Sequence, residues 1–267
     1  MNVFFKRKGY IVFGFLFLIS IAPFIYPFAA SNAVKQVHTE LFNPKLSYIN
    51  SLNKAVFYTD SVYSTYNLPQ FDTAKYVHIA SKFTKERFFH GLSTYSISEN
   101  WIALACSKLF WNHLSAIVSA NDILKYNSGL CSQQTIVFLE ILKNKGIGFR
   151  TVGLGYKQGP GHFLCEVKFK GTWHIFDVNK EPRWDRIMGS NNSMNYYMQN
   201  KDSLFLVYDG KLDRQVYNKI MEQVVYGDMN EFPAKNMLLF HHLTKLLTYV
   251  VPIIFLLLFF WFYKKRV

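Results

Sequence analysis

The sequence predicts an α+β domain held between two membrane-spanning helices. Three observations predict this class. An uncharged stretch lies near each end of the 267-residue chain, helical apolar patterns fill most of the first half between them, and short apolar strands joined by a tight turn follow. With the two stretches set aside, residues 31–245 have room for one sizeable domain.

The uncharged stretches run from Tyr10 to Ala30 and from Leu246 to Tyr263. A helix needs about 20 apolar residues to cross the hydrocarbon core, which the second stretch only just provides. Basic triplets at residues 6–8 and 264–266 flank the two stretches, and such clusters stay in the cytoplasm. We therefore expect cytoplasmic tails (1–9 and 264–267), transmembrane helices over 10–30 and 246–263, and an extracytoplasmic domain between them.

Each stretch has an alternative interpretation. Small residues at 31–33 offer a cleavage site, so the first stretch could be a signal peptide, but its length favours a retained anchor. The second could be a buried core helix, but the run from Ile253 to Phe260 at the end of the chain favours a span.

The formal net charge is +13, of which the two terminal triplets supply six. The remaining surplus is compatible with an anionic membrane surface or acidic envelope polymers as partners, but we expect most of these charges to form a solvated face. No basic run is interleaved with aromatic residues, so we expect no nucleic-acid binding.

Residues 31–120 form a helical N-terminal part, residues 121–180 the core, and residues 181–245 a less regular C-terminal part. The helices expected in this domain cover residues 46–63, from an N-cap at Asp72 to near 91, 99–119, 132–144 and 212–225. The helix over 132–144 is apolar on all sides, which predicts a buried central helix.

Strands are expected over residues 149–154, 162–169 and 172–178, and Lys170-Gly171 between the last two is a two-residue hairpin turn. With that turn, Phe169 pairs with Thr172 and Leu164 faces Asp177. His162 lies two residues from Leu164, so it points to the same face as Asp177. A slip of one residue would separate the two onto opposite faces.

Cys131 stands at the start of the central helix, where the helix dipole lowers the pKa of a thiol. A nearby imidazole can take the thiol proton, and a carboxylate can orient the imidazole. Taken singly, each residue has a structural explanation: a core cysteine, a satisfied strand histidine, an aspartate ending a strand. Taken together, Cys131, His162 and Asp177 predict a catalytic triad.

The other two cysteines, Cys106 and Cys165, either form a disulfide or pack as small apolar residues, and we expect the second. No group of residues has zinc-site spacing, so we expect no metal and no cofactor. His241-His242 beside the second span is expected at the membrane interface.

These residues resemble the transglutaminase-like superfamily, which has a papain-like fold. The resemblance covers about residues 125–180. Its motifs are Gly129-Leu130-Cys131, the Gly-Ile-x-x-Arg-x-Val segment at 146–152, His162, Gly171-Thr172-Trp173 and Asp177. It implies a papain-like core in which a central helix packs on a small antiparallel sheet. By the same resemblance, Cys131 is the nucleophile, His162 the general base and acid, and Asp177 the orienting group.

The implied activity is acyl transfer or hydrolysis on an amide of an envelope protein or peptide, through a thioester. The alternative is a non-catalytic binding or assembly module with the same fold. The backbone N–H of Cys131 is the favoured oxyanion donor. The indole groups of Trp101 and Trp111 are further candidates, although we expect both to pack in the core. We assign Arg150 and Trp173 to structure and leave Gln133 and Gln134 to solvent or a role not assigned. The sequence does not choose between cross-linking, proteolysis and amidase action, and does not give the oligomeric state.

Overall fold

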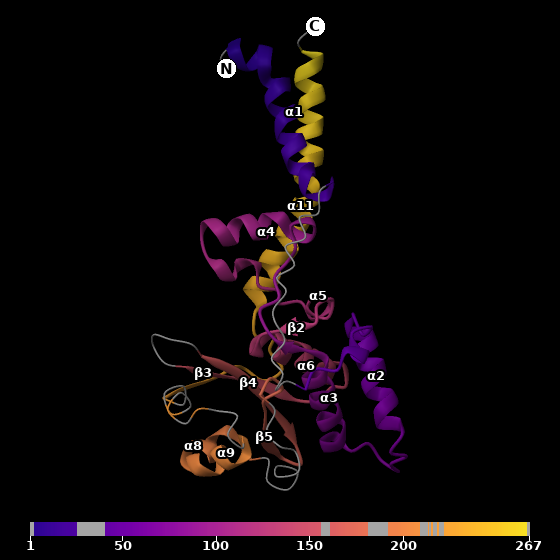
Figure 1. Ribbon diagram of the computed structural model, residues 1–267, viewed down its shortest axis with the longest axis vertical. Coiled ribbons are helices and arrows are strands. Elements are labelled where there is room, and N and C mark those ends of the chain that lie inside the picture. Colours follow the sequence, from indigo (N-terminus) through magenta and orange to yellow (C-terminus); the bar gives the residue numbers. More distant parts are fainter. Residues whose placement is uncertain are drawn as a thin grey trace. The chain divides into compact units, whose positions relative to one another are not determined.

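The computed structural model describes residues 3–25, 41–155, 161–180, 192–208 and 222–265, with the single positions 213, 215 and 218. The chain is mixed α+β and divides into two compact units (Figure 1). The first unit contains residues 1–33, 94–117 and 234–267, and the second contains 34–93 and 118–233. The expected boundary near residue 120 therefore differs from the observed arrangement, in which residues 94–117 belong with the two apolar helices.

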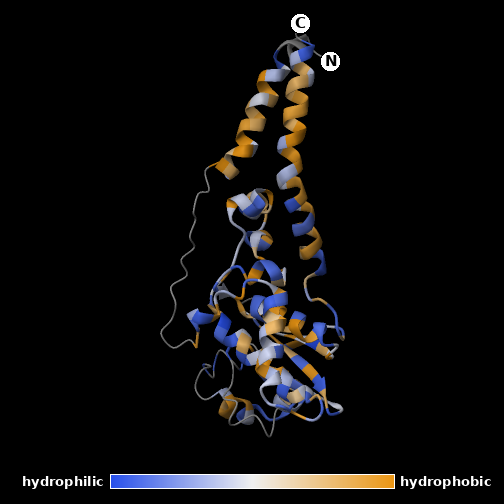
Figure 2. Cartoon of the chain, turned by 90° about the vertical axis from the view of Figure 1, so that its right-hand side faces the viewer, coloured by the Kyte–Doolittle hydropathy of each residue, from blue (hydrophilic) through white to orange (hydrophobic). Residues whose placement is uncertain are grey.

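Two long apolar helices, α1 (Val3–Ile25) and α11 (Lys235–Lys264), pair in the first unit (Figures 1 and 2). Their ring contacts show that they run antiparallel, because residues early in one helix meet residues late in the other. The ring centroids lie 6.0 Å apart for Tyr10 and Tyr263, 5.2 Å for Phe13 and Phe262, and 5.5 Å for Phe24 and Tyr249. The two ends of the chain thus lie at the same end of the pair.

Both helices are long and apolar enough to cross a membrane, and only 17% of the residues in each apolar window are buried. A core helix would be mostly buried, so this exposure disfavours the core interpretation of the C-terminal stretch. α1 begins at Val3, earlier than expected, and extends to Ile25, the last described residue of this segment. Residues 31–33, which offer the alternative cleavage site, lie outside the described residues. α11 begins eleven residues before the expected span, at Lys235.

The early turns of α11 are held by polar contacts with the rest of the first unit. His241 is fully buried, with Nε2 bonded to the Leu114 carbonyl at 2.9 Å and its ring edge-on to Tyr95. The expected interfacial position of His241-His242 stays a prediction, but tertiary packing uses the His241 imidazole as a buried hydrogen-bonding group. His242, its neighbour, is exposed.

The helix expected over 99–119 is broken. α4 spans Ile97–Leu109, the 3-10 helix η2 spans Asn112–Ser115, and α5 (Ala120–Ile123) belongs to the second unit. The break arises because the chain turns back to pair with the segment before α4: Thr94 bridges Ala116, and the Tyr95 N–H donates to the Ser115 carbonyl at 3.1 Å.

In the second unit, the helix expected over 46–63 divides into η1 (Pro44–Leu46) and α2 (Leu52–Ser64), since Ser51 caps the second of these. The N-cap at Asp72 is confirmed: its Oδ1 accepts from the Lys75 N–H at 3.1 Å and starts α3 (Thr73–Arg87), which ends before residue 91.

The predicted central helix is α6 (Cys131–Asn144), and its apolar side chains are buried. A Schellman motif ends the helix just before Gly146, which has a φ of +66°. The Gly146 N–H donates to the Lys143 carbonyl, and the Ile147 N–H donates to the Leu142 carbonyl.

An antiparallel sheet of order β5-β4-β3-β6 completes the unit. Its strands are β3 (Phe149–Gly155), β4 (His162–Phe169), β5 (Thr172–Phe176) and β6 (Gln223–Tyr226). The helix expected over 212–225 is wrong at its C-terminal end, because residues 223–226 pair with β3 as an edge strand; most of 212–221 lies outside the described residues.

The β4–β5 hairpin has the predicted register, with Phe169 opposite Thr172. Lys170 and Gly171 have φ of 51° and 79°, the positive values of a type I′ turn. β5 ends at Phe176 rather than Val178, because residues 178–180 turn away from the ladder.

The sheet has helices on both faces. On one face Phe176 packs against Phe138 of α6, with ring centroids 5.7 Å apart. On the other face α8 (Met194–Gln199) and α9 (Lys201–Tyr208) bury a cluster that includes Leu164 and Ile175. Because side chains alternate along a strand, His162 and Asp177 share this second face with Leu164.

Candidate active site

Cys131 is the first residue of α6, and short contacts fix the chain just before it. β2 (Ser128–Gly129) pairs in parallel with β1 (Phe89–His90), and the Gln134 amide donates to the Gly129 carbonyl at 2.8 Å. Cys131 itself is half-buried. The thiol is therefore held at a helix N-terminus with partial access to solvent.

Of the two alternatives left for Gln133 and Gln134, solvent exposure is excluded, since both side chains are buried. The Gln133 Oε1 accepts from the N–H of Ser93 at 3.0 Å and of Leu130 at 3.1 Å, and its Nε2 donates to the Ser93 carbonyl at 2.7 Å. Ser93 lies 40 residues earlier, so only the tertiary structure reveals this role. The two glutamines clamp the turn that presents Cys131.

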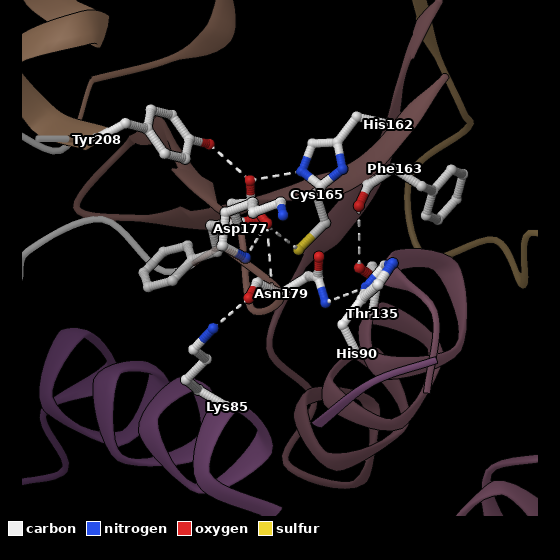
Figure 3. Close-up of polar contacts among 11 residues, drawn as sticks. Lys85, His90, Thr135, His162, Phe163, Cys165, Asp177, Asn179 and Tyr208 are labelled. Atoms are coloured by element: carbon white, nitrogen blue, oxygen red, sulfur yellow. Dashed lines mark hydrogen bonds and ion pairs between the residues drawn. The ribbon is translucent and has the colours of Figure 1, made fainter. Parts of the chain in front are cut away.

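His162 and Asp177 share a hydrogen bond, with Nε2 and Oδ2 separated by 2.6 Å (Figure 3). The same-face prediction from the hairpin turn is confirmed. The side chains are 10% and 1% exposed, so the contact is shielded from water. A carboxylate only accepts hydrogen bonds, so His162 donates through Nε2.

Three further donors satisfy the Asp177 carboxylate. The Tyr208 hydroxyl donates to Oδ2 at 2.7 Å, and the backbone N–H groups of Asn179 and Lys180 donate to Oδ1 at 3.2 and 3.0 Å. Tyr208 was missed at the sequence level, because it ends α9, 31 residues beyond Asp177, and no local motif marks it. Four donors hold this carboxylate in one orientation.

The buried contacts favour the ionised forms of both partners. Burial alone would raise the pKa of Asp177, but His162, the Lys180 N–H and the Tyr208 hydroxyl outweigh it and lower that pKa. Burial alone would lower the pKa of His162, but the charge and hydrogen bond of Asp177, with a contribution from Cys131, raise it. Both shifts favour a carboxylate paired with an imidazolium.

The same imidazole also influences the pKa of the Cys131 thiol. Burial acts to raise the pKa of its thiol, but the hydrogen bond and charge of His162 and a backbone hydrogen bond with Phe163 bring that pKa below its ordinary value. Because Nε2 of His162 faces Asp177, Nδ1 is the ring nitrogen left to interact with the thiol. The arrangement can support a thiolate–imidazolium pair.

Asn179 connects the triad to the segment before Cys131. Its Nδ2 lies 3.0 Å from Nδ1 of His90 in β1, and Lys85 donates through Nζ to its backbone carbonyl (Figure 3). Its Oδ1 is buried and has no hydrogen-bond partner among the described residues. These contacts tie the turn after Asp177 to the chain that flanks the N-terminus of α6.

The two tryptophans considered as oxyanion donors belong to the first unit, whereas Cys131 belongs to the second. The Trp101 indole N–H donates to the Thr248 carbonyl at 3.4 Å. Trp111 is 55% exposed, so the expectation that it packs in the core is wrong.

None of the three cysteines forms a disulfide. Cys165 is fully buried, as expected for a small apolar residue, with Sγ 3.6 Å from the Phe176 carbonyl, while Cys106 is half-buried. In the described part of the chain, no three His, Cys, Asp or Glu side chains gather into a potential metal site.

Arg150 and Trp173 have the structural role assigned to them. The Arg150 Nε bonds to the fully buried Glu166 at 2.7 Å, and its guanidinium lies over the rings of Trp173 and Tyr226 at 4.5 and 4.3 Å. Glu166 in turn accepts from the Met194 N–H at 2.6 Å, which fastens α8 to the sheet.

Comparison with known proteins adds no relative to this picture. No protein-family model, no curated protein and no solved structure matches the chain.

Proposed function

We propose that the protein is a membrane-anchored, transglutaminase-like cysteine enzyme with a papain-like core. Cys131 is the nucleophile, His162 the general base and acid, and Asp177 the orienting group. One observation carries the proposal: the imidazole of His162 engages the Asp177 carboxylate through Nε2 at 2.6 Å, and the same imidazole lowers the pKa of the thiol that opens α6. Singly these residues are ordinary, but this order of thiol, imidazole and carboxylate is that of a nucleophilic triad.

The reaction begins with attack of the Cys131 thiolate on an amide carbonyl carbon. Charge develops on the carbonyl oxygen, where the backbone N–H of Cys131 at the start of α6 can stabilise it. The His162 imidazolium then gives its Nδ1 proton to the amide nitrogen, the C–N bond breaks, and an amine leaves. A thioester to Cys131 and a neutral imidazole remain.

The second half regenerates the thiol. An amine or water attacks the thioester carbon, and the neutral His162 accepts its proton. The C–S bond breaks and the thiolate leaves, which restores the starting ion pair. Asp177 stays ionised throughout and stabilises the imidazolium before and after each transfer.

The two apolar helices are proposed as retained membrane anchors. Their antiparallel pairing and the basic triplets at the two ends support a topology with both termini in the cytoplasm and residues 31–245 outside it. Substrates on that side are envelope proteins or peptides. Reporter fusions at each end test this: either end scoring outside the cytoplasm contradicts the topology.

Labelling with a thiol-reactive acyl probe tests the activity in the full-length protein. We expect Cys131 to be acylated, and Cys131→Ser to abolish the labelling. Cys106→Ser is the matched control, since Cys106 is also half-buried and forms no disulfide. Equal labelling of Cys131→Ser and the wild type would refute the enzymatic proposal and favour a binding module.

A further inference from the structure

Three consecutive large apolar side chains at and just beyond the C-terminal end of α4 are exposed. Leu109, Phe110 and Trp111 are 75%, 79% and 55% exposed. Three such residues in a row are uncommon on a surface that faces only water. We call Leu109–Trp111 the α4 tip.

Hydrogen bonds within the first unit fix the level of α4 along α11. The Asn100 Nδ2 donates to the Thr244 hydroxyl at 2.9 Å, and the Trp101 indole N–H donates to the Thr248 carbonyl at 3.4 Å. Lys245 is the last charged residue before the uncharged stretch 246–263. α4 therefore meets α11 at the level where α11 changes from polar to apolar.

The orientation of α4 is the one expected of a helix that lies in the membrane interface. α4 crosses α11 rather than running beside it (Figure 1). If α11 passes through a bilayer, the start of its uncharged stretch lies at the membrane interface. A helix that crosses α11 at this level then lies in the plane of that interface. Tryptophan prefers this region, and cations find lipid phosphates there. Lys108, next to the tip, is exposed, and Lys245 lies at the same level with its Nζ 4.7 Å from the centroid of the Tyr95 ring.

We propose that the α4 tip inserts into the headgroup–acyl boundary of the bilayer that α1 and α11 cross, with Lys108 beside an anionic lipid phosphate. This inference rests on the proposed membrane anchoring but not on catalysis. Lipid is favoured over a second protein copy because the outward side chains of α11 at the same level are themselves apolar and exposed: Leu246 is 61% and Tyr249 56% exposed. The tip thus extends a surface that lipid already covers.

The test uses tryptophan fluorescence of the full-length protein in nanodiscs made with lipids brominated near the carbonyl end of the acyl chains. The emission of each tryptophan is obtained by subtracting the spectrum of the variant in which that tryptophan is replaced by Phe from the wild-type spectrum. We expect the brominated lipids to quench the emission of Trp111. They should also quench the emission of Trp261 in α11. Trp173, on the sheet of the second unit, is the matched control and should stay unquenched. Trp111→Phe preserves an apolar ring and should leave the fold intact.

The outcomes separate this inference from the anchoring on which it rests. Quenching at Trp261 without quenching at Trp111 overturns the α4 proposal and leaves the spans in place. Unquenched but blue-shifted emission from Trp111 also overturns it, because protein rather than lipid then covers the tip. Absence of quenching at both positions refutes the anchoring and the α4 proposal together.

Discussion

Replacement of Asp177 by Asn tests the triad most directly. Four donors converge on the carboxylate: His162 Nε2, the Tyr208 hydroxyl and two backbone N–H groups. An amide offers one acceptor oxygen instead of two. If that oxygen keeps the backbone donors, its NH₂ faces His162 and forces Nε2 to accept. The ring proton then sits on Nδ1. This nitrogen is therefore no longer free to accept the proton of the Cys131 thiol.

The expected cost follows from these contacts. Without the carboxylate, the imidazolium loses the charge that raises its pKa, so the thiolate fraction of Cys131 falls with it. We expect the rate of acylation to drop by about 10²–10⁴-fold, the range known for a triad with the wrong tautomer or a lost proton acceptor. The Tyr208 hydroxyl is left facing a donor, which costs about 1–3 kcal/mol of folding stability.

The assay is single-turnover acylation of Cys131, with circular dichroism to show that the variant is folded. Asp177→Ala should be impaired as well, since it removes the acceptor for His162 altogether. Asp202→Asn is the matched control, because Asp202 is exposed on α9 and lies outside the triad. A folded Asp177→Asn protein in which Cys131 is acylated at the wild-type rate would refute the proposed triad.

Three further outcomes are expected. Tyr208→Phe should lower acylation several-fold, corresponding to about 1 kcal/mol. The same variant should raise the pKa of Asp177, because the carboxylate loses a hydrogen-bond donor. The depressed pKa of Asp177 contributes stability that is lost as pH falls, so acid unfolding of the variant should begin at a higher pH. An unchanged acid transition would contradict this coupling. The alkylation rate of Cys131 should rise at a pH below 8.5, and this rise should move to higher pH in His162→Ala. A wild-type rate that rises only near pH 8.5 would argue against the thiolate. One residue inserted in the Lys170–Gly171 turn should abolish activity by reversing the facing of a strand, and retained turnover would contradict the register argument.

Local rules determined much of the framework from the sequence alone. The Lys170-Gly171 turn fixes the hairpin register because only positive φ values close a two-residue loop that follows the strand twist, and the register places His162 beside Asp177. The Asp72 cap and the end of the central helix at Asn144 were equally readable, since each depends on contacts within a few residues.

The tertiary structure decided what depends on partners far along the chain. Tyr208 reaches Asp177 across 31 residues, and Gln133 reaches Ser93 across 40, so no local pattern distinguishes either from a surface residue. Residues 223–226 become a strand because the edge of β3 offers unpaired backbone groups. His241 is buried because Leu114 supplies an acceptor and Tyr95 a ring. A polar side chain goes inward only where a partner meets it, and that partner exists only once the chain has folded.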